Sequence, residues 1–599
     1  MKGLELLGLN KTLVNCTICL FLGLVPISAM GQSMPYTFSA NTAAKASEVN
    51  ANFTYLLERF GVIRETTVNC GTSGTGSGIN SAIQNGYNSI VINGICKENI
   101  KLDGTEGNIP RLLKLRGANN DASQDKIIDN SGYTEHVLTF NYGGMLVTID
   151  NLTISGGDRG ITTWMNINLR IRNSKVEGYK NRGITLQGGS VMEGENLTID
   201  GSYSGATTDE QGLRMWGGAV AYVKNLTITN NQKFGLTMWL SDIEIKENVI
   251  LTGNGRAINV GKGAAFTSNA NINISGSTDG AISVSQGLFH QWDDGSITIT
   301  NTTSGKAFYA WISNINIDGL TVTGDGSTEE SLMKLDTSVS YLKNLSLSNS
   351  GKNGLHFNNS ESSIDNLTSN NNKGDGISAW RSRISVKNSL ISGNLDDGIE
   401  LNSGSSLSLE SSTISTNSDD GIEAYENNYI QVIDSTISNN NSEAIAYGEG
   451  SFLRIKDSTI SGVSGVNAIS GSDNAILKIT EDSGSTVIST TNNVAIRLSY
   501  NSSGQIRSGV QVTSTGTNGY GVQISRGGLI HIGSGATITG DSNYDSIDGI
   551  GGAKIDIDYG ATVQSVVCAS DNQTMVILNG SSGNYPSPTI GANCITVKH

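Results

Sequence analysis

Residues 366–392 read NLTSNNNKGDGISAWRSRISVKNSLIS. Three short stretches within them alternate apolar and polar residues: one begins at Asn366, one follows Gly376, and one is Ile384-Ser385-Val386. Glycine and asparagine separate these stretches, and the first motif starts again at Asn388. Alternation with a period of two is typical of β-strands that bury one face. The stretch therefore predicts a repeat unit of three short strands.

The same unit recurs along most of the chain, mainly at intervals of about 22–23 residues, a period typical of solenoid repeats. One such unit cannot bury its apolar face alone, whereas stacked units share one interior. Helical repeats are excluded because β-branched residues dominate and every unit carries glycine and asparagine. We expect about 17 turns at ~4.8 Å each, a rod roughly 80 Å long. The first motif, Asn-Leu-Thr-Ile or a relative, begins at Asn151, Asn173, Asn196, Asn225, Asn248, Asn271, Ser296, Gly319, Asn344, Asn366, Asn388, Ser411, Asp434 and Asp457.

These repeats resemble the right-handed parallel β-helix proteins of the pectin-lyase-like superfamily, over residues 67–563. The entry into the region is similar too: Gly78-Ile79-Asn80-Ser81-Ala82-Ile83 precedes Ser89-Ile90-Val91-Ile92 and then Glu98-Asn99-Ile100-Lys101-Leu102. The resemblance implies an all-β fold, a right-handed parallel β-helix solenoid that is built from these repeats and capped at both ends.

The N-terminal segment 1–31 reads as a secretory signal peptide. Cys16 to Leu24 is an apolar stretch, and Ala29-Met30-Gly31 supplies small residues for cleavage. The run is short for a transmembrane helix, and no later segment is apolar enough to span a bilayer. We therefore expect a secreted protein, extracellular or periplasmic.

The segments that flank the repeats are expected to close the two ends of the solenoid. Residues 32–66 form an N-terminal segment with a predicted amphipathic helix over 43–60, which would cap an open end or contact another copy of the chain. Residues 564–599 break the repeat and are expected to form the C-terminal cap.

Four cysteines follow the signal peptide, one pair near each end of the chain, and the two members of each pair are equally far apart in sequence. Four cysteines allow three pairings, and local pairing suits an oxidising compartment. Zinc binding is the alternative, but the chain has no C-x-x-C motif and no nearby histidine pair. We expect two disulfides, Cys70–Cys96 and Cys568–Cys594.

The composition narrows the class of partner. The chain has 599 residues, a net charge of −15, 74 glycines and only 5 prolines. Acidity opposes nucleic acid or an anionic membrane as the main partner. The scarcity of proline and of charged residues argues against a proline-rich stalk, a collagen and a charged disordered chain.

A second repeated motif, Gly-Ile or a relative, is anchored for example at Gly160, Gly376 and Gly398. The strand that follows it predicts an outward column of aromatic side chains. Its first and third residues are apolar, so the second and fourth face solvent. Five of the six tryptophans occupy the fourth position, and only Trp292 does not. Outward indoles pack against loops, stack on sugar rings or meet a protein partner, and large exposed aromatics often mark binding surfaces. The aromatic members are Trp164, Trp216, Trp239, Trp311, Trp380 and Tyr425.

The second position of the same strand gathers ionisable residues. Adjacent turns would hold these side chains ~5 Å apart, close enough for ion pairing or proton transfer. A solvated ladder of charges is the alternative. Arg214, Glu400 and Glu423 are candidate substrate contacts, and Lys334 and His356 could supply the cation and the base of a lyase or epimerase.

The residue before each glycine forms a third column, which is basic early and acidic late. Arg159, Arg182, Arg256 and Lys306 precede Asp375, Asp397, Asp420 and Glu443. Stacked carboxylates should raise one another's pKa or attract a cation such as Ca²⁺. No calcium nonapeptide repeat is present, and no other cofactor is expected.

Asp375-Gly376-Ile377, followed by Asp396-Asp397-Gly398-Ile399, is similar to the three-aspartate set of polygalacturonase-type glycosidases. The resemblance implies a general acid at Asp396 or Asp397 and water activation by Asp375. The pattern departs from that family, because Asp420 stands where its Gly-His-Gly histidine would fall. Asp-Gly-Ile is also a common turn sequence.

Together these features predict a secreted β-helix protein that binds an extracellular polysaccharide along its Trp-lined face. They leave open whether it also hydrolyses or eliminates that polysaccharide. A non-catalytic adhesin or surface-structure protein is the alternative function. Neither the glycan nor the oligomeric state follows from the sequence.

Overall fold

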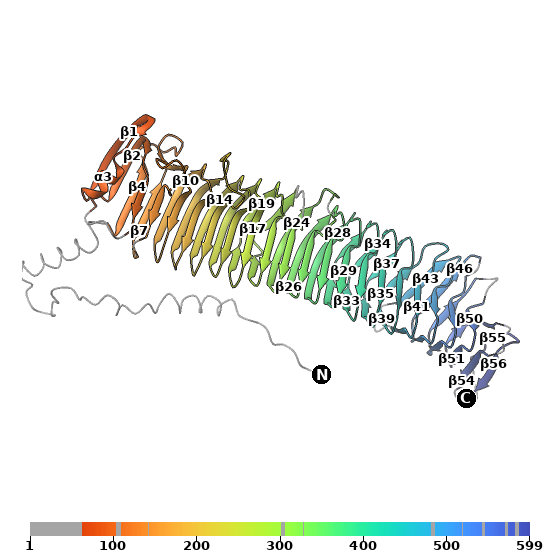
Figure 1. Cartoon of the computed structure of the whole chain (residues 1–599). Coiled ribbons are helices and arrows are strands. Elements are labelled where there is room, and N and C mark those ends of the chain that lie inside the picture. Colours follow the sequence, from red (N-terminus) through yellow and green to blue (C-terminus); the bar gives the residue numbers. More distant parts are fainter. Residues whose placement is uncertain are drawn as a thin grey trace, which may run out of the picture.

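The computed structural model is a long, straight solenoid (Figure 1). It describes residues 63–599 except 104–109, 142, 301–305, 328, 481–484, 518, 542–544, 570–572 and 581–585. The predicted signal peptide (1–31) and amphipathic helix (43–60) lie outside the described residues. All strand pairings within them are parallel, as a right-handed parallel β-helix requires.

One sheet, here called the Gly-Ile sheet, contains the strands that follow the Gly-Ile motifs, one per turn. A larger sheet of 35 strands forms the remaining faces of the solenoid. The Gly-Ile strands that carry the candidate site are β6 (Leu138–Phe140), β9 (Arg159–Thr163), β11 (Arg182–Gln187), β13 (Gln211–Trp216), β15 (Phe234–Trp239), β17 (Arg256–Gly261), β20 (Ile282–Ser285), β23 (Phe308–Trp311), β25 (Met333–Asp336), β27 (Leu355–Asn358), β29 (Ile377–Trp380), β32 (Ile399–Asn402), β35 (Ile422–Tyr425) and β38 (Ile445–Gly448).

The first residue of the Asn-Leu-Thr-Ile motif makes a corner in the larger sheet. Asn173 bends β10 (Asn168–Glu177) with a φ of 46°, and Asn196 bends β12 (Val191–Asp200) with a φ of 50°. Asparagine tolerates this left-handed conformation better than most residues. The Asn196 side-chain amide donates to Oδ1 of Asn173 at 2.8 Å, so the corners also bond along the stack.

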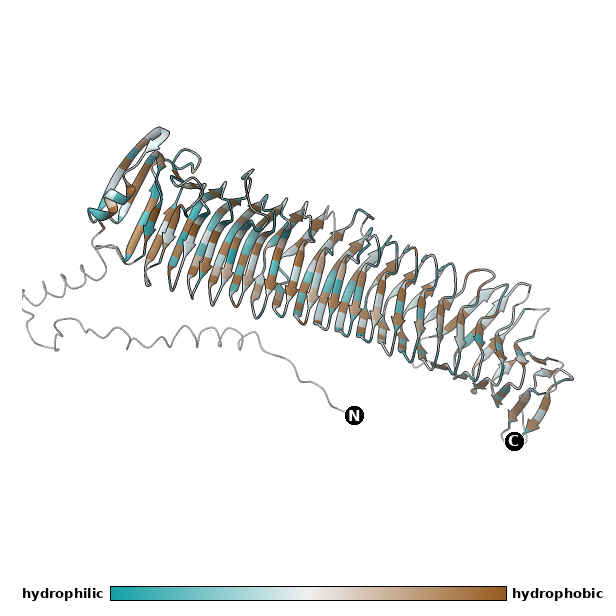
Figure 2. Cartoon of the chain, in the orientation of Figure 1, coloured by the Kyte–Doolittle hydropathy of each residue, from teal (hydrophilic) through white to brown (hydrophobic). Residues whose placement is uncertain are grey.

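Apolar residues of every turn point into one continuous core. Hydrophobic and hydrophilic residues alternate along the strands in Figure 2, as the period of two requires. Equivalent side chains stack on one another; Phe266 and Phe289, for example, stack with ring centroids 4.6 Å apart.

The glycine of the Gly-Ile motif is required by close packing. A Cβ on Gly398 would collide with Cγ2 of Ile414 and lie 2.6 Å from the carbonyl oxygen of Gly421. Both of those atoms belong to the packed solenoid, so any residue larger than glycine would have to displace them.

The two ends of the described solenoid each contain one of the expected disulfides, Cys70–Cys96 and Cys568–Cys594. The entry region that resembles the family consists of a short helix, α3 (Ile79–Gln84), followed by the strands β2 (Ser89–Lys97) and β3 (Ile100–Leu102). At the other end, β53 (Ser565–Cys568) pairs with β50 (Ile547–Ile550), so the strands after residue 563 extend the same stack. None of the described helices is long and apolar enough to cross a membrane.

The solenoid has about 22 turns, more than the 17 or so expected. The additional turns lie before Asn151 and after Asp457, where the Asn-Leu-Thr-Ile motif is missing but the stacking continues. Parallel pairing of the strands therefore does not require the Asn-Leu-Thr-Ile motif in every turn.

Gly398→Ala should destabilise the protein by about 1–3 kcal/mol, because the added methyl group has no space between Ile414 and Gly421. Gly143→Ala is the matched control, since its nearest neighbour would be the Met165 carbonyl oxygen at 3.5 Å. Midpoints of urea unfolding measure both changes. Equal midpoints for the two variants would contradict the packing argument.

Candidate functional site

The aromatic column lies in register on the outward face of the Gly-Ile sheet. Trp216 pairs with Trp239 on the next turn, and Asn358, Trp380 and Asn402 follow one another farther along. The side chains of Trp216 and Trp380 are 46% and 48% exposed, although tryptophan is normally well buried. Strand alternation therefore turns these indoles toward solvent.

Two rings of the column lie over glycines of the following turn. A Cβ on Gly261 would collide with the Trp239 ring, and a Cβ on Gly448 would lie 2.9 Å from Cε1 of Tyr425. The Arg214 guanidinium lies 5.5 Å from the centroid of the Trp239 ring. Rings that rest on the sheet surface form flat, low-entropy platforms.

A shallow hollow lies beside the later part of the column. It has a volume of about 440 Å³, and it is formed by the turns that follow β29, β32, β35 and β38. Its lining residues are Arg381, Ser403, Gly404, Glu426, Asn427 and Glu449.

Two carboxyl pairs occupy the acidic part of the same face. Asp375 shares a hydrogen bond with Glu400, and Asp397 shares one with Glu423. Burial, and then the negative charge of Glu400, raises the pKa of Asp375 to about 9. Burial and Glu423 raise the pKa of Asp397 to about 10. Both aspartates therefore hold a proton at neutral pH and can donate it.

The same aspartates also stabilise the turns of the solenoid. The backbone N–H of Asp397 donates to Oδ1 of Asp375 at 3.3 Å, and that of Asp420 donates to Oδ1 of Asp397 at 2.9 Å. The N–H of Glu443 continues the series by donating to Oδ1 of Asp420 at 2.8 Å. One oxygen of each aspartate thus has a structural partner.

Lys334 and His356 lie on adjacent turns, in the same column as Glu400. Lys334 Nζ lies 3.5 Å from Oδ2 of Asp336. Burial, and then the charge of Lys334, lowers the pKa of His356, so its imidazole is neutral at pH 7. A neutral imidazole beside an ammonium group has the composition of a base and a cation.

Asp396 completes a group of three carboxylates with Asp375 and Asp397. One oxygen from each lies within 4.8 Å of the other two, and Asp397, Asp419 and Asp420 form a similar group. These are the acidic residues that could hold Ca²⁺, which prefers six to eight oxygens at about 2.3–2.6 Å. Backbone N–H groups already bind Oδ1 of Asp375 and Asp397, which leaves fewer free oxygens than such a site needs.

A third candidate metal group was not anticipated from the sequence. His531 lies on the larger sheet with Nε2 3.2 Å from Asp558 and Nδ1 3.5 Å from Asp556. The sequence contained a signal for this group. In His531-Ile532 and in Asp556-Ile557-Asp558 the isoleucines are apolar and point inward, so alternation places the histidine and both aspartates on the outer face.

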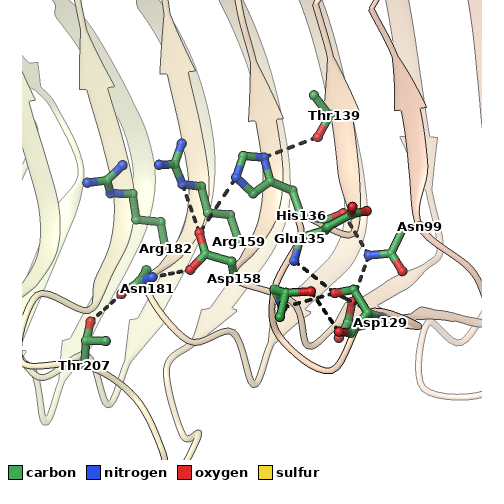
Figure 3. Close-up of polar contacts among 12 residues, drawn as sticks. Asn99, Asp129, Glu135, His136, Thr139, Asp158, Arg159, Asn181, Arg182 and Thr207 are labelled. Carbon is green, nitrogen blue, oxygen red and sulfur yellow. Dashed lines mark hydrogen bonds and ion pairs between the residues drawn. The ribbon is translucent and has the colours of Figure 1, made fainter.

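The basic part of the face forms a cluster, here called the arginine ladder: Arg159, Arg182 and Arg214. Arg159 and Arg182 lie in register on β9 and β11, and Arg214 follows on β13, one column over. Figure 3 shows the side chains of His136, Arg159 and Arg182 next to one another on successive turns. His136 was missed by the sequence analysis because no glycine follows it; its place two positions before Leu138 was the available signal.

The chain matches the family model described as the right handed beta helix region, over residues 136–304 and 318–480. These two stretches are more than half of the chain, which therefore belongs to this family. No curated protein matches the sequence.

The solved structures that align with this chain do so at low sequence identity. One is the Vag8–C1 inhibitor complex, at 10% identity and a TM-score of 0.27, covering 85% of this chain and 100% of the other. Another is the A-module of a mannuronan C-5 epimerase from Azotobacter vinelandii, at 12% identity, a TM-score of 0.16, and 88% and 100% coverage. A PL6 family alginate lyase is 11% identical, with a TM-score of 0.21 and 89% and 100% coverage.

Stability should fall as the pH rises, because the folded protein retains a proton on Asp397 that the unfolded chain releases. The folded pKa of about 10 lies above the ordinary 3.8, so this contribution is lost progressively between those values. Asp397→Asn cannot ionise, yet it can donate to Glu423 and accept from the Asp420 N–H. We expect the variant to lose less stability than the wild type between about pH 5 and about pH 8.

Urea unfolding at the two pH values measures the difference. Asp365→Asn, the same substitution on the larger sheet, is the control and should follow the wild type. If the wild type and Asp397→Asn lose the same free energy of unfolding between the two pH values, Asp397 is not protonated in the folded protein.

Proposed function

We propose that this protein acts outside the cytoplasm and binds a linear polysaccharide along the outward face of the Gly-Ile sheet. The observation that carries the proposal is the in-register column of outward indoles, of which Trp164, Trp216, Trp311 and Trp380 are exposed and Trp239 is half-buried. From Trp164 to Tyr425 the column extends over 12 turns, about 50 Å at ~4.8 Å a turn. A polymer that lay along the axis would contact a ring every few turns, which suits the apolar faces of sugar rings.

Two further features support this placement. The shallow hollow beside Trp380 and Tyr425 offers polar groups next to the aromatic surface. The two disulfides suit an oxidising compartment, where such a polymer would be met. An adhesin without catalytic activity would use the same face.

Cleavage of the bound polymer is a second candidate function, favoured by the two carboxyl pairs. A protonated Asp375 or Asp397 could act as a general acid, with Glu400 or Glu423 beside it as the second carboxyl group. Lys334 and the neutral His356 could instead serve an elimination. The backbone hydrogen bonds to the aspartates also give them a structural role, so only a measurement of activity separates the two roles.

Replacing Trp216, Trp239 and Trp380 together with alanine should abolish binding, because the stacking surface is lost. Affinity gel electrophoresis through a panel of neutral and acidic polysaccharides measures the retention. Trp292→Ala is the matched control, since Trp292 is 40% exposed but lies after β21 (Leu288–Gln291) on the larger sheet. Retention by the triple variant that equals that of the control would overturn the proposal.

If the carboxyl pairs are catalytic, purified protein should release new reducing ends from a polysaccharide that it retains. Asp397→Asn should lower that rate by about 100-fold or more, because a proton donor in the reaction is lost. An activity lost only in His356→Ala or Lys334→Ala would assign the chemistry to elimination. Retention without release would leave the face a binding surface.

A further inference from the structure

We propose that the arginine ladder is a binding site for an oxyanion, the carboxylate or sulfate group of an acidic polysaccharide. This inference rests on the proposed function and adds to it the charge of the ligand and the place where that charge is bound. It is drawn from the charge of the three guanidinium groups and from the buried Nε atoms of Arg159 and Arg182, which make no hydrogen bond.

The carboxylates near the arginine ladder do not saturate it. Nε of Arg159 lies 3.6 Å from Oδ2 of Asp158, and Nη2 of Arg182 lies 3.8 Å from Oδ2 of Asp209. Charge-assisted hydrogen bonds are about 2.7–2.9 Å long, so neither arginine makes one with its carboxylate. Asp158 also accepts from Asn181 and faces His136, which divides its charge further.

The local charge is positive in a protein whose net charge is −15. Lys233 takes the closer contact to Asp209, at 2.5 Å, so two carboxylates face the three arginines and Lys233. Burial, and then the charge of Arg182, lowers the pKa of Arg159, and the same two causes lower the pKa of Arg214. The three like charges therefore destabilise one another, and an anion among them would relieve this repulsion.

Buried donors around the arginine ladder have no partner. The side chains of Arg159 and Arg182 are only 21% and 17% exposed, and the Nε of each is buried without a hydrogen bond. Thr162 and Thr185 lie between these arginines and the aromatic column, and their hydroxyls are also buried and unpartnered. Unsatisfied buried donors are costly to the folded protein, so such a cluster favours a ligand that accepts several hydrogen bonds.

The arginine ladder adjoins the aromatic column. Trp164 follows β9 and Trp216 ends β13, so both belong to turns that carry an arginine. Arg214 lies over the Trp239 ring. A sugar stacked on the Trp239 ring would hold an acidic substituent near Arg214, and a polymer that extends across the sheet would bring further substituents to Arg159 and Arg182. Guanidinium groups match carboxylate and sulfate geometry in a bidentate manner.

The test compares dextran sulfate, polygalacturonate and uncharged dextran as probes of the full-length protein. We expect retention of at least one polyanion, with affinity that falls as NaCl rises from about 0.05 M to about 0.5 M. The double variant Arg159→Gln/Arg182→Gln should bind that polyanion about tenfold or more weakly, since two charged donors are lost. Preference for dextran sulfate or for polygalacturonate identifies the oxyanion as sulfate or carboxylate.

Arg170→Gln/Arg172→Gln is the charge-matched control, because these arginines lie on β10 of the larger sheet and pair with Glu193 and Glu195. It should bind like the wild type. Arg214→Gln replaces the double variant if circular dichroism shows that the latter is unfolded.

The outcomes separate this inference from the function on which it rests. Equal loss in the ladder variant and in the charge-matched control would overturn the site, as would polyanion binding unchanged in the ladder variants. Retention of uncharged dextran alone, lost in the tryptophan triple variant, would overturn the oxyanion site and leave the proposed function intact. No retention of any probe by the wild type would overturn both.

Discussion

Parallel backbone hydrogen bonding between successive turns is the constraint on which the rest of this structure depends. It places each residue directly beside its counterpart one turn away, as Ile377 lies beside Ile399 and Trp216 beside Trp239. Residues of one kind therefore gather in columns about 4.8 Å apart. Apolar columns form the core, and buried asparagines form internal ladders, as where Asn394 Nδ2 donates to Oδ1 of Asn417 at 2.9 Å.

The same constraint forces charges of one sign together. In a globular domain, Asp375 and Asp397 could diverge, whereas here the ladder holds them on adjacent turns, each beside a glutamate. The carboxyls respond by retaining protons. Guanidinium groups cannot give up a proton near neutral pH, so Arg159 and Arg182 keep their repulsion and need an anion to relieve it. Repulsion between like charges is therefore lowered by protonation at the acidic end of this face, and at the basic end it would be lowered by a bound anion.

The columns could be predicted from the sequence because the Gly-Ile motif sets the register of each strand. That is why the outward position of Trp216 and Trp380 follows from simple alternation, and why two local disulfides follow from two equal cysteine separations. What the sequence cannot supply is contact between different columns. The pairing of Asp375 with Glu400 crosses from one column and one turn to another, and its distance depends on how each side chain bends.

Irregular turns were the other source of error. His136 shares the column of Arg159, but β6 lacks the glycine that marks this column elsewhere, so its place became clear only from the pairing of β6 with β9. The turn count was too low for the same reason. Stacking of the turns needs alternating apolar residues and a residue that can bend the strand. The complete Asn-Leu-Thr-Ile and Gly-Ile motifs occur only where the columns of asparagine and glycine are continuous.

Protonation of Asp375 and Asp397 reduces the repulsion that an acidic polymer would meet along this face. Counted as ionised, Asp375 and Asp397 with Glu400 and Glu423 would repel such a polymer from the later turns. With both aspartates protonated, these four carboxyl groups carry two negative charges fewer than their composition implies. The arginine ladder would then attract the polymer at one end while the acidic end repels it less than its composition implies. A single aromatic column that passes both clusters is compatible with one long ligand for this reason.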